Sequence, residues 1–183
     1  AAGVNLLAKN NCQAPTRIFD WGAGPGFSSL IMAKNFPNAH VFYNETNSDL
    51  QRIFEWFKTH SGITNITAVG DTITPDCDLV QAYEITEHIE HVDGNGVGDP
   101  VSMLAGILAT TRADARLLQA SCWSAENKYT TLGHFLTSNV DGRVVKNSRG
   151  GMHFKNALDK RGWKFVDMGF NGRPKLFQCQ AIV

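Results

Sequence analysis

The sequence has little of what marks a membrane, disulfide-rich or nucleic-acid-coating protein. No apolar run approaches the roughly 20 residues that a membrane-spanning helix needs. The 17 basic and 17 acidic side chains give a net charge of zero, which argues against an extended grip on nucleic acid. The four cysteines are scattered and form no CxxC pair, so we expect reduced thiols in a cytoplasmic protein rather than a disulfide frame or a zinc site. They are Cys12, Cys77, Cys122 and Cys179.

The chain also lacks internal repeats, low-complexity segments and any obvious linker. Its 183 residues are 43% hydrophobic and 19% charged, which is typical of water-soluble globular proteins. We therefore expect one domain over 1–183 with a substantial core.

The zero net charge hides an asymmetry along the sequence. Residues 1–140 hold 8 basic and 14 acidic side chains, whereas 141–183 hold 9 basic and 3 acidic. The basic end is either a solvated face or a seat for an anionic substrate.

Apolar runs recur at a spacing that predicts alternating strands and helices. This alternation favours a single doubly wound, mainly parallel α/β sheet with helices on both faces, and seven runs read as strands. The predicted strands are 17–21, 40–45, 65–69, 78–83, 115–121, 164–169 and 176–183. The predicted helices are 27–35, 48–60, 100–110 and 153–161, with Gly62 and Gly162 as end signals.

The segment 122–151 departs from this alternation. It is polar and glycine-rich, and it carries the aromatic residues Trp123, Tyr129 and Phe135. A connection of this length in a compact domain is usually functional or disordered. The embedded aromatics favour a flap that closes over a site.

The stretch "RIFDWGAGPGFSSL" places Gly22, Gly24 and Gly26 between a predicted strand and a predicted helix. Glycine is selected where φ is positive or where another group approaches the main chain closely. A strand, a glycine turn and a helix N-terminus form the usual cradle for a nucleotide-like ligand. The spacing is GxGxG, and the large side chain of Phe27 disfavours a nicotinamide-binding turn.

Three successive predicted strands end in an acidic residue. Asp20 closes the first strand, Glu45 ends the second 19 residues after Gly26, and Asp71 follows the third in "VGD". Ligands of parallel sheets bind outside the carboxyl ends of the strands. Each acid alone could be a helix cap or a surface residue, but together they indicate a ribose-containing ligand.

This pattern resembles the class I S-adenosylmethionine (SAM)-dependent methyltransferases, which have a Rossmann-like fold. The similar segments are "FDWGAGPG", "VFYNET", "VGDTI" and "DLVQAYEITEHIEHV", and the resemblance covers nearly the whole chain. The resemblance implies a sheet with an antiparallel last strand and SAM as the cofactor. By this resemblance, Asp20 would help to hold the methionine part of SAM, and the three glycines would let the cofactor lie against the backbone. Glu45 would bind the ribose, and Asp71 would contact the adenine amine.

The residues Glu84, Glu87, His88 and His91 have the spacing of one helix face. Two carboxylates and an imidazole suit Mg²⁺ or Mn²⁺ better than a structural zinc. The alternative is that they are polar residues on an exposed turn. We assign Glu84 to cofactor binding as well as to this candidate metal site.

The ExxEH spacing resembles the fourth motif of ubiquinone-biosynthesis O-methyltransferases and of small-RNA 3′-terminal 2′-O-methyltransferases. That resemblance implies a divalent metal that holds the acceptor oxygens. It adds His153, which precedes a predicted helix, as a further ligand. His88 and His134 are the candidates for a general base in catalysis, since a hydroxyl acceptor benefits from one.

We therefore expect a SAM-dependent methyltransferase that acts on the oxygen of a small molecule. An RNA- or nucleotide-directed enzyme is the alternative that the basic end of the chain favours. A cofactor-binding module without catalysis is a third reading.

Overall fold

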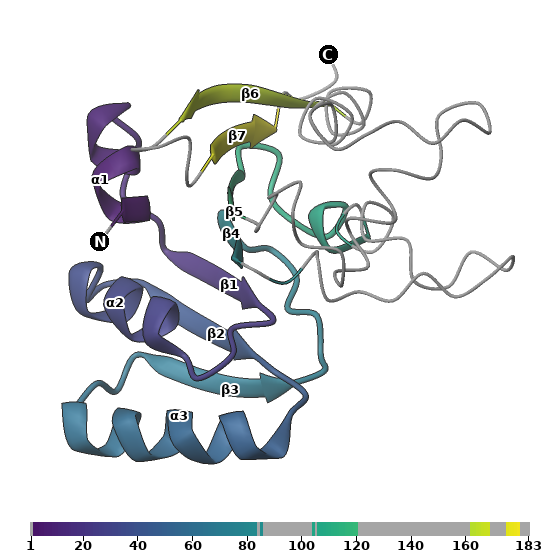
Figure 1. The fold of residues 1–183 in the computed structure, drawn as a ribbon. Coiled ribbons are helices and arrows are strands. Elements are labelled where there is room, and N and C mark those ends of the chain that lie inside the picture. Colours follow the sequence, from purple (N-terminus) through teal and green to yellow (C-terminus); the bar gives the residue numbers. More distant parts are fainter. Residues whose placement is uncertain are drawn as a thin grey trace, which may run out of the picture.

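The computed structural model describes residues 2–83, 85, 104, 106–120, 162–168 and 175–179. Figure 1 shows the arrangement of the helices and strands. The helices are α1 (Ala2–Lys9), α2 (Phe27–Asn35) and α3 (Ser48–Ser61). The strands are β1 (Arg17–Trp21), β2 (His40–Asn44), β3 (Ile66–Gly70), β4 (Leu79–Tyr83), β5 (Arg116–Ala120), β6 (Trp163–Met168) and β7 (Lys175–Cys179).

The strands form one sheet in the order β3-β2-β1-β4-β5-β7-β6. The first five strands of this order pair in parallel, which confirms the predicted mainly parallel α/β sheet. β7 runs antiparallel to both β5 and β6. In Figure 1 the arrows of β1, β2 and β3 point toward the same edge.

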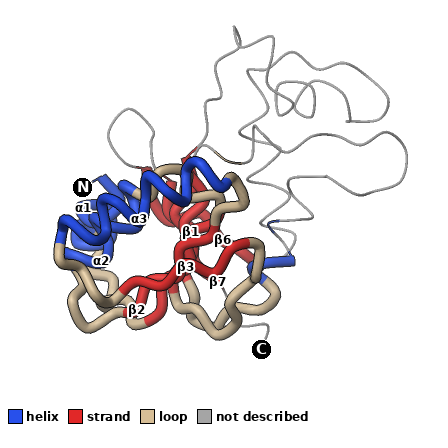
Figure 2. The backbone as a smooth tube through the Cα atoms, turned by 90° about the horizontal axis from the view of Figure 1, so that it is seen from below, coloured by secondary structure: helices blue, strands red, loops and turns tan. Residues whose placement is uncertain are grey.

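Both faces of the central strands are buried, because neighbouring residues of one strand enter different cores. Ile18 packs with residues of α1, α2 and α3, whereas Phe19 packs on the other face with Leu104 and Ile107. This explains why β1, β4 and β5 are buried along nearly their whole length rather than at alternate positions. Figure 2 shows the three helices beside the strands from below.

The helix ends follow local chemistry that the sequence carries. Asn47 caps α3, since its side-chain oxygen accepts the backbone N–H groups of Asp49 and Leu50 at 2.9 and 3.3 Å. Gly62 ends α3 with φ of +67°, as predicted. The sequence interpretation missed α1, because this short helix buries only Gly3, Leu6 and Leu7 and presents no long apolar pattern.

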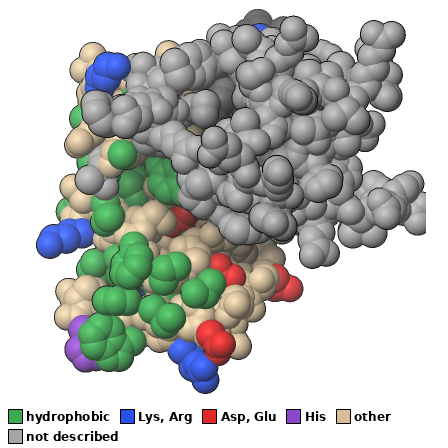
Figure 3. Space-filling model, in the orientation of Figure 1, with side chains coloured by type: hydrophobic (Ala, Val, Ile, Leu, Met, Phe, Trp, Pro, Cys, Tyr) green, Lys and Arg blue, Asp and Glu red, His purple; other side chains and the backbone are tan. Residues whose placement is uncertain are grey.

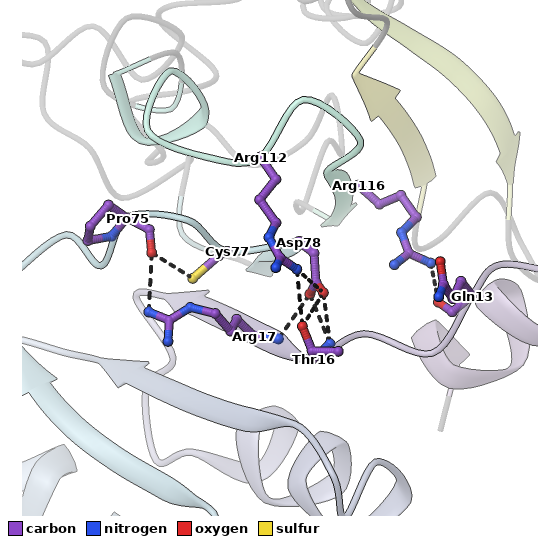
Figure 4. A network of polar contacts seen from close by, with 8 residues as sticks. All are labelled: Gln13, Thr16, Arg17, Pro75, Cys77, Asp78, Arg112 and Arg116. Atoms are coloured by element: carbon purple, nitrogen blue, oxygen red, sulfur yellow. Dashed lines mark hydrogen bonds and ion pairs between the residues drawn. The ribbon is translucent and has the colours of Figure 1, made fainter.

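A polar network ties together the amino ends of β1 and β4 (Figure 4). The buried Asp78 carboxylate accepts the backbone N–H groups of Thr16 and Arg17 at 2.8 and 3.0 Å. The Thr16 hydroxyl donates to it at 2.7 Å, and Arg112 completes an ion pair at 3.1 Å. Asp78 therefore stabilises the sheet at the edge opposite the strand ends where ligands bind.

The predicted strands and helices that can be compared mostly agree with the structure to within one residue. β2 ends at Asn44 rather than Glu45, which leaves Glu45 in the following turn. Within the predicted helix 100–110, residues 104 and 106–108 are helical and 109–110 form a turn. The predicted helix 153–161 and the segment 122–151 lie outside the described residues. Among the described helices, none has the length and apolar character to cross a membrane.

Candidate functional site

The strand order reverses at β1. On one side of β1 the sheet continues with β2 and β3, and on the other side with β4 and β5. Loops that follow such neighbouring strands diverge and leave a crevice at the carboxyl edge. The glycine turn after β1 lies there, since Trp21 is the last residue of β1 and Gly26 precedes α2.

The three glycines of this turn all have positive φ, but each meets a different neighbour. A Cβ on Gly22 would lie 2.3 Å from the Ile85 side chain, and a Cβ on Gly26 would lie 2.3 Å from the Phe54 ring. A Cβ on Gly24, at φ of +57°, would meet none of the described residues within 4 Å. Gly22 and Gly26 are thus required by packing, whereas Gly24 leaves its backbone open to a ligand.

Side chains from β2 and the turn after it fix both polar groups of Gly24. The Gly24 N–H donates to Glu45 Oε2 at 2.9 Å, and the Tyr43 hydroxyl donates to the Gly24 carbonyl at 2.6 Å. Tyr43 in turn stacks on Phe54 of α3 with ring centroids 3.7 Å apart. The open turn is therefore rigidly held before any ligand arrives.

Glu45 also organises the start of α3. Its Oε1 accepts the backbone N–H groups of Thr46 and Asn47, both at 2.8 Å. A carboxylate offers about four acceptor positions, and these bonds with Gly24 use three of them. About one position is left for a ribose hydroxyl, whereas the sequence interpretation gave Glu45 two such bonds.

Asp20 is a buried acid with an unmet hydrogen bond. Its side chain is 1% exposed, and Oδ2 accepts the hydroxyls of Ser28 and Ser29 in the first turn of α2. Oδ1 is buried and has no partner among the described residues. Burial raises the pKa of Asp20 to about 6, against the lowering effect of the two serine bonds. An unpaired buried oxygen is costly, so Oδ1 is expected to accept a hydrogen bond from a group other than the described residues.

Two further buried polar atoms lie on the same face of the sheet as Asp20. Asp20 is paired in register with Gln81 of β4, and Tyr83 follows two residues later. Within the described part of the chain, Gln81 Nε2 and the Tyr83 hydroxyl lack partners. Burial raises the pKa of Tyr83, and the charge of Asp20 raises it further. The Tyr83 hydroxyl lies against Gly3 of α1 rather than at the glycine turn.

Asn44, which the sequence interpretation overlooked, links two of the loops at this edge. Its Nδ2 donates to the Gly70 carbonyl at 2.7 Å, and its Oδ1 accepts the Gly22 N–H at 3.4 Å. Asp71 follows Gly70 and is exposed. Asn44 therefore joins the glycine turn to the strand end that carries Asp71.

The remaining predicted site residues cannot be placed. Glu84, Glu87, His88, His134 and His153 all lie outside the described residues. Over the parts of the chain that are described, no three His, Cys, Asp or Glu side chains come together as a metal site would require. The divalent metal and the general base stay predictions from the sequence.

Comparisons with solved structures identify the fold. The N-terminal domain of EvdMO1, solved with SAH and D-fucose, matches 98% of the chain and 82% of its own, with 15% identity and a TM-score of 0.63. The mitomycin 7-O-methyltransferase MmcR matches 90% of the chain and 48% of its own, with 17% identity and a TM-score of 0.60. Coclaurine N-methyltransferase, bound to N-methylheliamine and SAH, matches 91% and 49%, with 14% identity and a TM-score of 0.59.

The chain therefore has the fold of SAM-dependent methyltransferases, as the sequence motifs indicated. It spans about half the length of the two named methyltransferases. No family model matches the sequence, and no curated protein matches it. At these identities the comparison establishes the fold, and the activity must be argued from the site.

Proposed function

We propose that the chain binds SAM in the crevice at the carboxyl ends of β1, β2 and β4 and transfers its methyl group to an oxygen of a small molecule. Two observations carry this proposal together: no described residue lies near a Cβ built on Gly24, and no described residue gives Asp20 Oδ1 a hydrogen bond. SAM has a nucleoside that would lie against Gly24 and an ammonium group that would donate to Asp20 Oδ1.

The residues that would hold the cofactor have distinct tasks. Asp20 would accept a hydrogen bond from the ammonium group, directly or through a water molecule. Gly24 would let the nucleoside lie against the backbone, and Glu45 would accept from a ribose hydroxyl. Asp71, beside the strand end that Asn44 ties to the turn, would meet the adenine amine.

Methyl transfer from SAM needs little covalent help from the protein. The bound sulfonium supplies an activated methyl group, so the chain must mainly align the acceptor in line with the S–CH₃ bond. A small-molecule acceptor is supported by the neighbours, since MmcR is a mitomycin methyltransferase and the coclaurine enzyme holds N-methylheliamine. Incubation with SAM and an acceptor panel should yield products heavier by one methylene, whereas a binding module would yield none.

Glu45→Gln should weaken the binding of S-adenosylhomocysteine (SAH) by about 10- to 100-fold, because a charged acceptor contributes roughly 1.5–3 kcal/mol. The control ligand is SAH that lacks its 2′-hydroxyl. Calorimetry measures the affinity of both ligands for the parent chain and for Glu45→Gln. If Glu45 binds that hydroxyl, the substitution should cost less affinity for the deoxy ligand. Equal losses for both ligands would mean that Glu45 does not bind the 2′-hydroxyl.

A further inference from the structure

Gln81 of β4 is a buried glutamine that the description of the crevice leaves without a task. Gln81 and Asp20 are each 1% exposed. Among the described residues, none accepts a hydrogen bond from Gln81 Nε2, and none donates one to Asp20 Oδ1. A buried polar atom without a partner in a native structure requires an explanation, and here a donor and an acceptor require one together.

The two residues are direct neighbours on parallel strands. Asp20 of β1 is paired in register with Gln81 of β4, and adjacent strands lie about 4.8 Å apart. Ile18 and Leu79, two residues earlier on each strand, belong to the core on the side of the helices. Since side chains alternate along a strand, Asp20 and Gln81 lie on this same face. A ligand group that reaches one of them is therefore close to the other.

The surroundings of this pair are apolar. Ile18, Leu79 and Leu118 lie on the same face of the sheet, and α2 and α3 pack against it. Hydrophobic side chains also gather over these two helices in Figure 3. Burial of a polar group without a hydrogen bond costs free energy. Folding alone therefore does not explain a glutamine at position 81, where the preceding residues of β4 are apolar.

We propose that Gln81 Nε2 donates to the carboxylate of the methionine part of SAM, while Asp20 Oδ1 accepts from its ammonium group. This inference rests on the proposed function, in which Asp20 already holds the ammonium group. An α-amino acid carries a donor and an acceptor on one carbon atom, and the two strands offer the complementary acceptor and donor side by side. Each contact is direct or passes through one water molecule, which is nearly as favourable as a direct bond.

The donor beside Asp20 makes the site selective. The N–H groups of an amide carry partial positive charge, so they do not attract an ammonium group and interact favourably only with the carboxylate. A hydrogen bond to a charged group contributes more than one between neutral groups. Gln81 therefore favours intact SAM and SAH over nucleoside thioethers that lack the carboxylate.

Gln81→Met tests this role with three ligands, whose affinities are measured by calorimetry. SAH carries both charged groups, decarboxylated SAH keeps only the ammonium group, and 5′-methylthioadenosine has neither. Methionine keeps the length of the side chain and removes the donor. We expect the variant to bind SAH about 10- to 100-fold more weakly, because the lost bond is to a charged group. It should bind the other two ligands as the parent chain does.

Gln119→Met is the matched control. Gln119 is also a buried glutamine, but it is paired with Ala82 and so lies on the other face of the sheet. This variant should keep the affinity of the parent chain for SAH.

Urea unfolding without ligand is the second measurement on Gln81→Met. We expect its midpoint to stay the same or to move to higher urea, because an apolar group replaces an unpaired buried donor. A lower midpoint would show that the Gln81 amide is bonded within the chain, which would overturn the inference.

The calorimetry also separates this inference from the proposed function. If Gln81→Met binds SAH as the parent does, or loses as much affinity for decarboxylated SAH as for SAH, another group binds the carboxylate and the inference is overturned. The parent chain still binds SAH in both cases, so the proposed function is unaffected. A parent chain that binds none of the three ligands would overturn the proposed function and this inference together.

Discussion

Gly24→Val is expected to abolish the binding of SAM and SAH while the chain stays folded. A Cβ at Gly24 meets no atom of the described residues within 4 Å, so this part of the protein has room for a side chain. The branched side chain would occupy the space in which the nucleoside is proposed to lie. Calorimetry with SAH should show a loss of affinity of more than about 100-fold, since the clash removes the whole nucleoside contact.

The control must separate this clash from backbone strain. Valine at positive φ costs roughly 1–3 kcal/mol of folding free energy. Gly62 has φ of +67°, and a Cβ on it would also meet none of the described residues within 4 Å, but it lies at the far end of α3. Gly62→Val should therefore lose similar stability and keep its affinity for SAH. Unchanged affinity in Gly24→Val would remove Gly24 from the site.

Asp20→Asn is expected to stabilise the unliganded chain at pH 8 while it weakens SAH binding. Burial raises the pKa of Asp20 to about 6, so the ionised carboxylate is held at a cost. Asparagine has the same shape, still accepts from Ser28 and Ser29, and carries no charge. The gain in unfolding free energy should reach up to about 3 kcal/mol, since one pKa unit corresponds to about 1.4 kcal/mol.

The raised pKa of Asp20 also predicts how the folding stability of the parent chain changes with pH. The folded pKa of Asp20 lies above the ordinary aspartate value of 3.8, so the folded state keeps the proton to higher pH than the unfolded state. The contribution of Asp20 to stability is full below about pH 4 and is lost as the pH rises to about 6. Urea unfolding across this range should show the loss in the parent and not in Asp20→Asn.

Binding is the second readout for Asp20. Loss of the charged acceptor for the ammonium group should lower the affinity for SAH by about 10- to 100-fold. Asp114→Asn, at an exposed acid, is the control and should change neither stability nor affinity. A variant that gains stability and keeps full affinity would show that Asp20 contacts no ligand.

The sequence predicted the parallel sheet because strand and helix periods, glycine turns and caps are local signals. β1 and α2 were located at their observed limits, and Gly62 ended α3 as expected. α1 was missed, because its burial depends on the core formed by β1, β4 and β5 rather than on its own pattern. Local signals were therefore enough for elements with a strong sequence pattern of their own, but not for α1, whose position depends on tertiary contacts.

The roles within the site depended on contacts between distant residues. The three glycines look alike in sequence, yet among the described residues Ile85 crowds Gly22, Phe54 crowds Gly26, and none crowds Gly24. The bonds of Asn44 to Gly22 and Gly70 join positions far apart in the chain. No residue spacing reveals such bonds before the strands are placed side by side.

The most direct test of the account is a nuclear magnetic resonance titration of the ¹⁵N-labelled chain with SAH. We expect saturable shifts of the amide signals of Gly22, Gly24 and Glu45, with little change at Gly62 and Arg116 on the remote ends of α3 and β5. Amide signals that stay unmoved at millimolar SAH, or shifts confined to regions away from the glycine turn, would contradict the proposal that this crevice binds the cofactor.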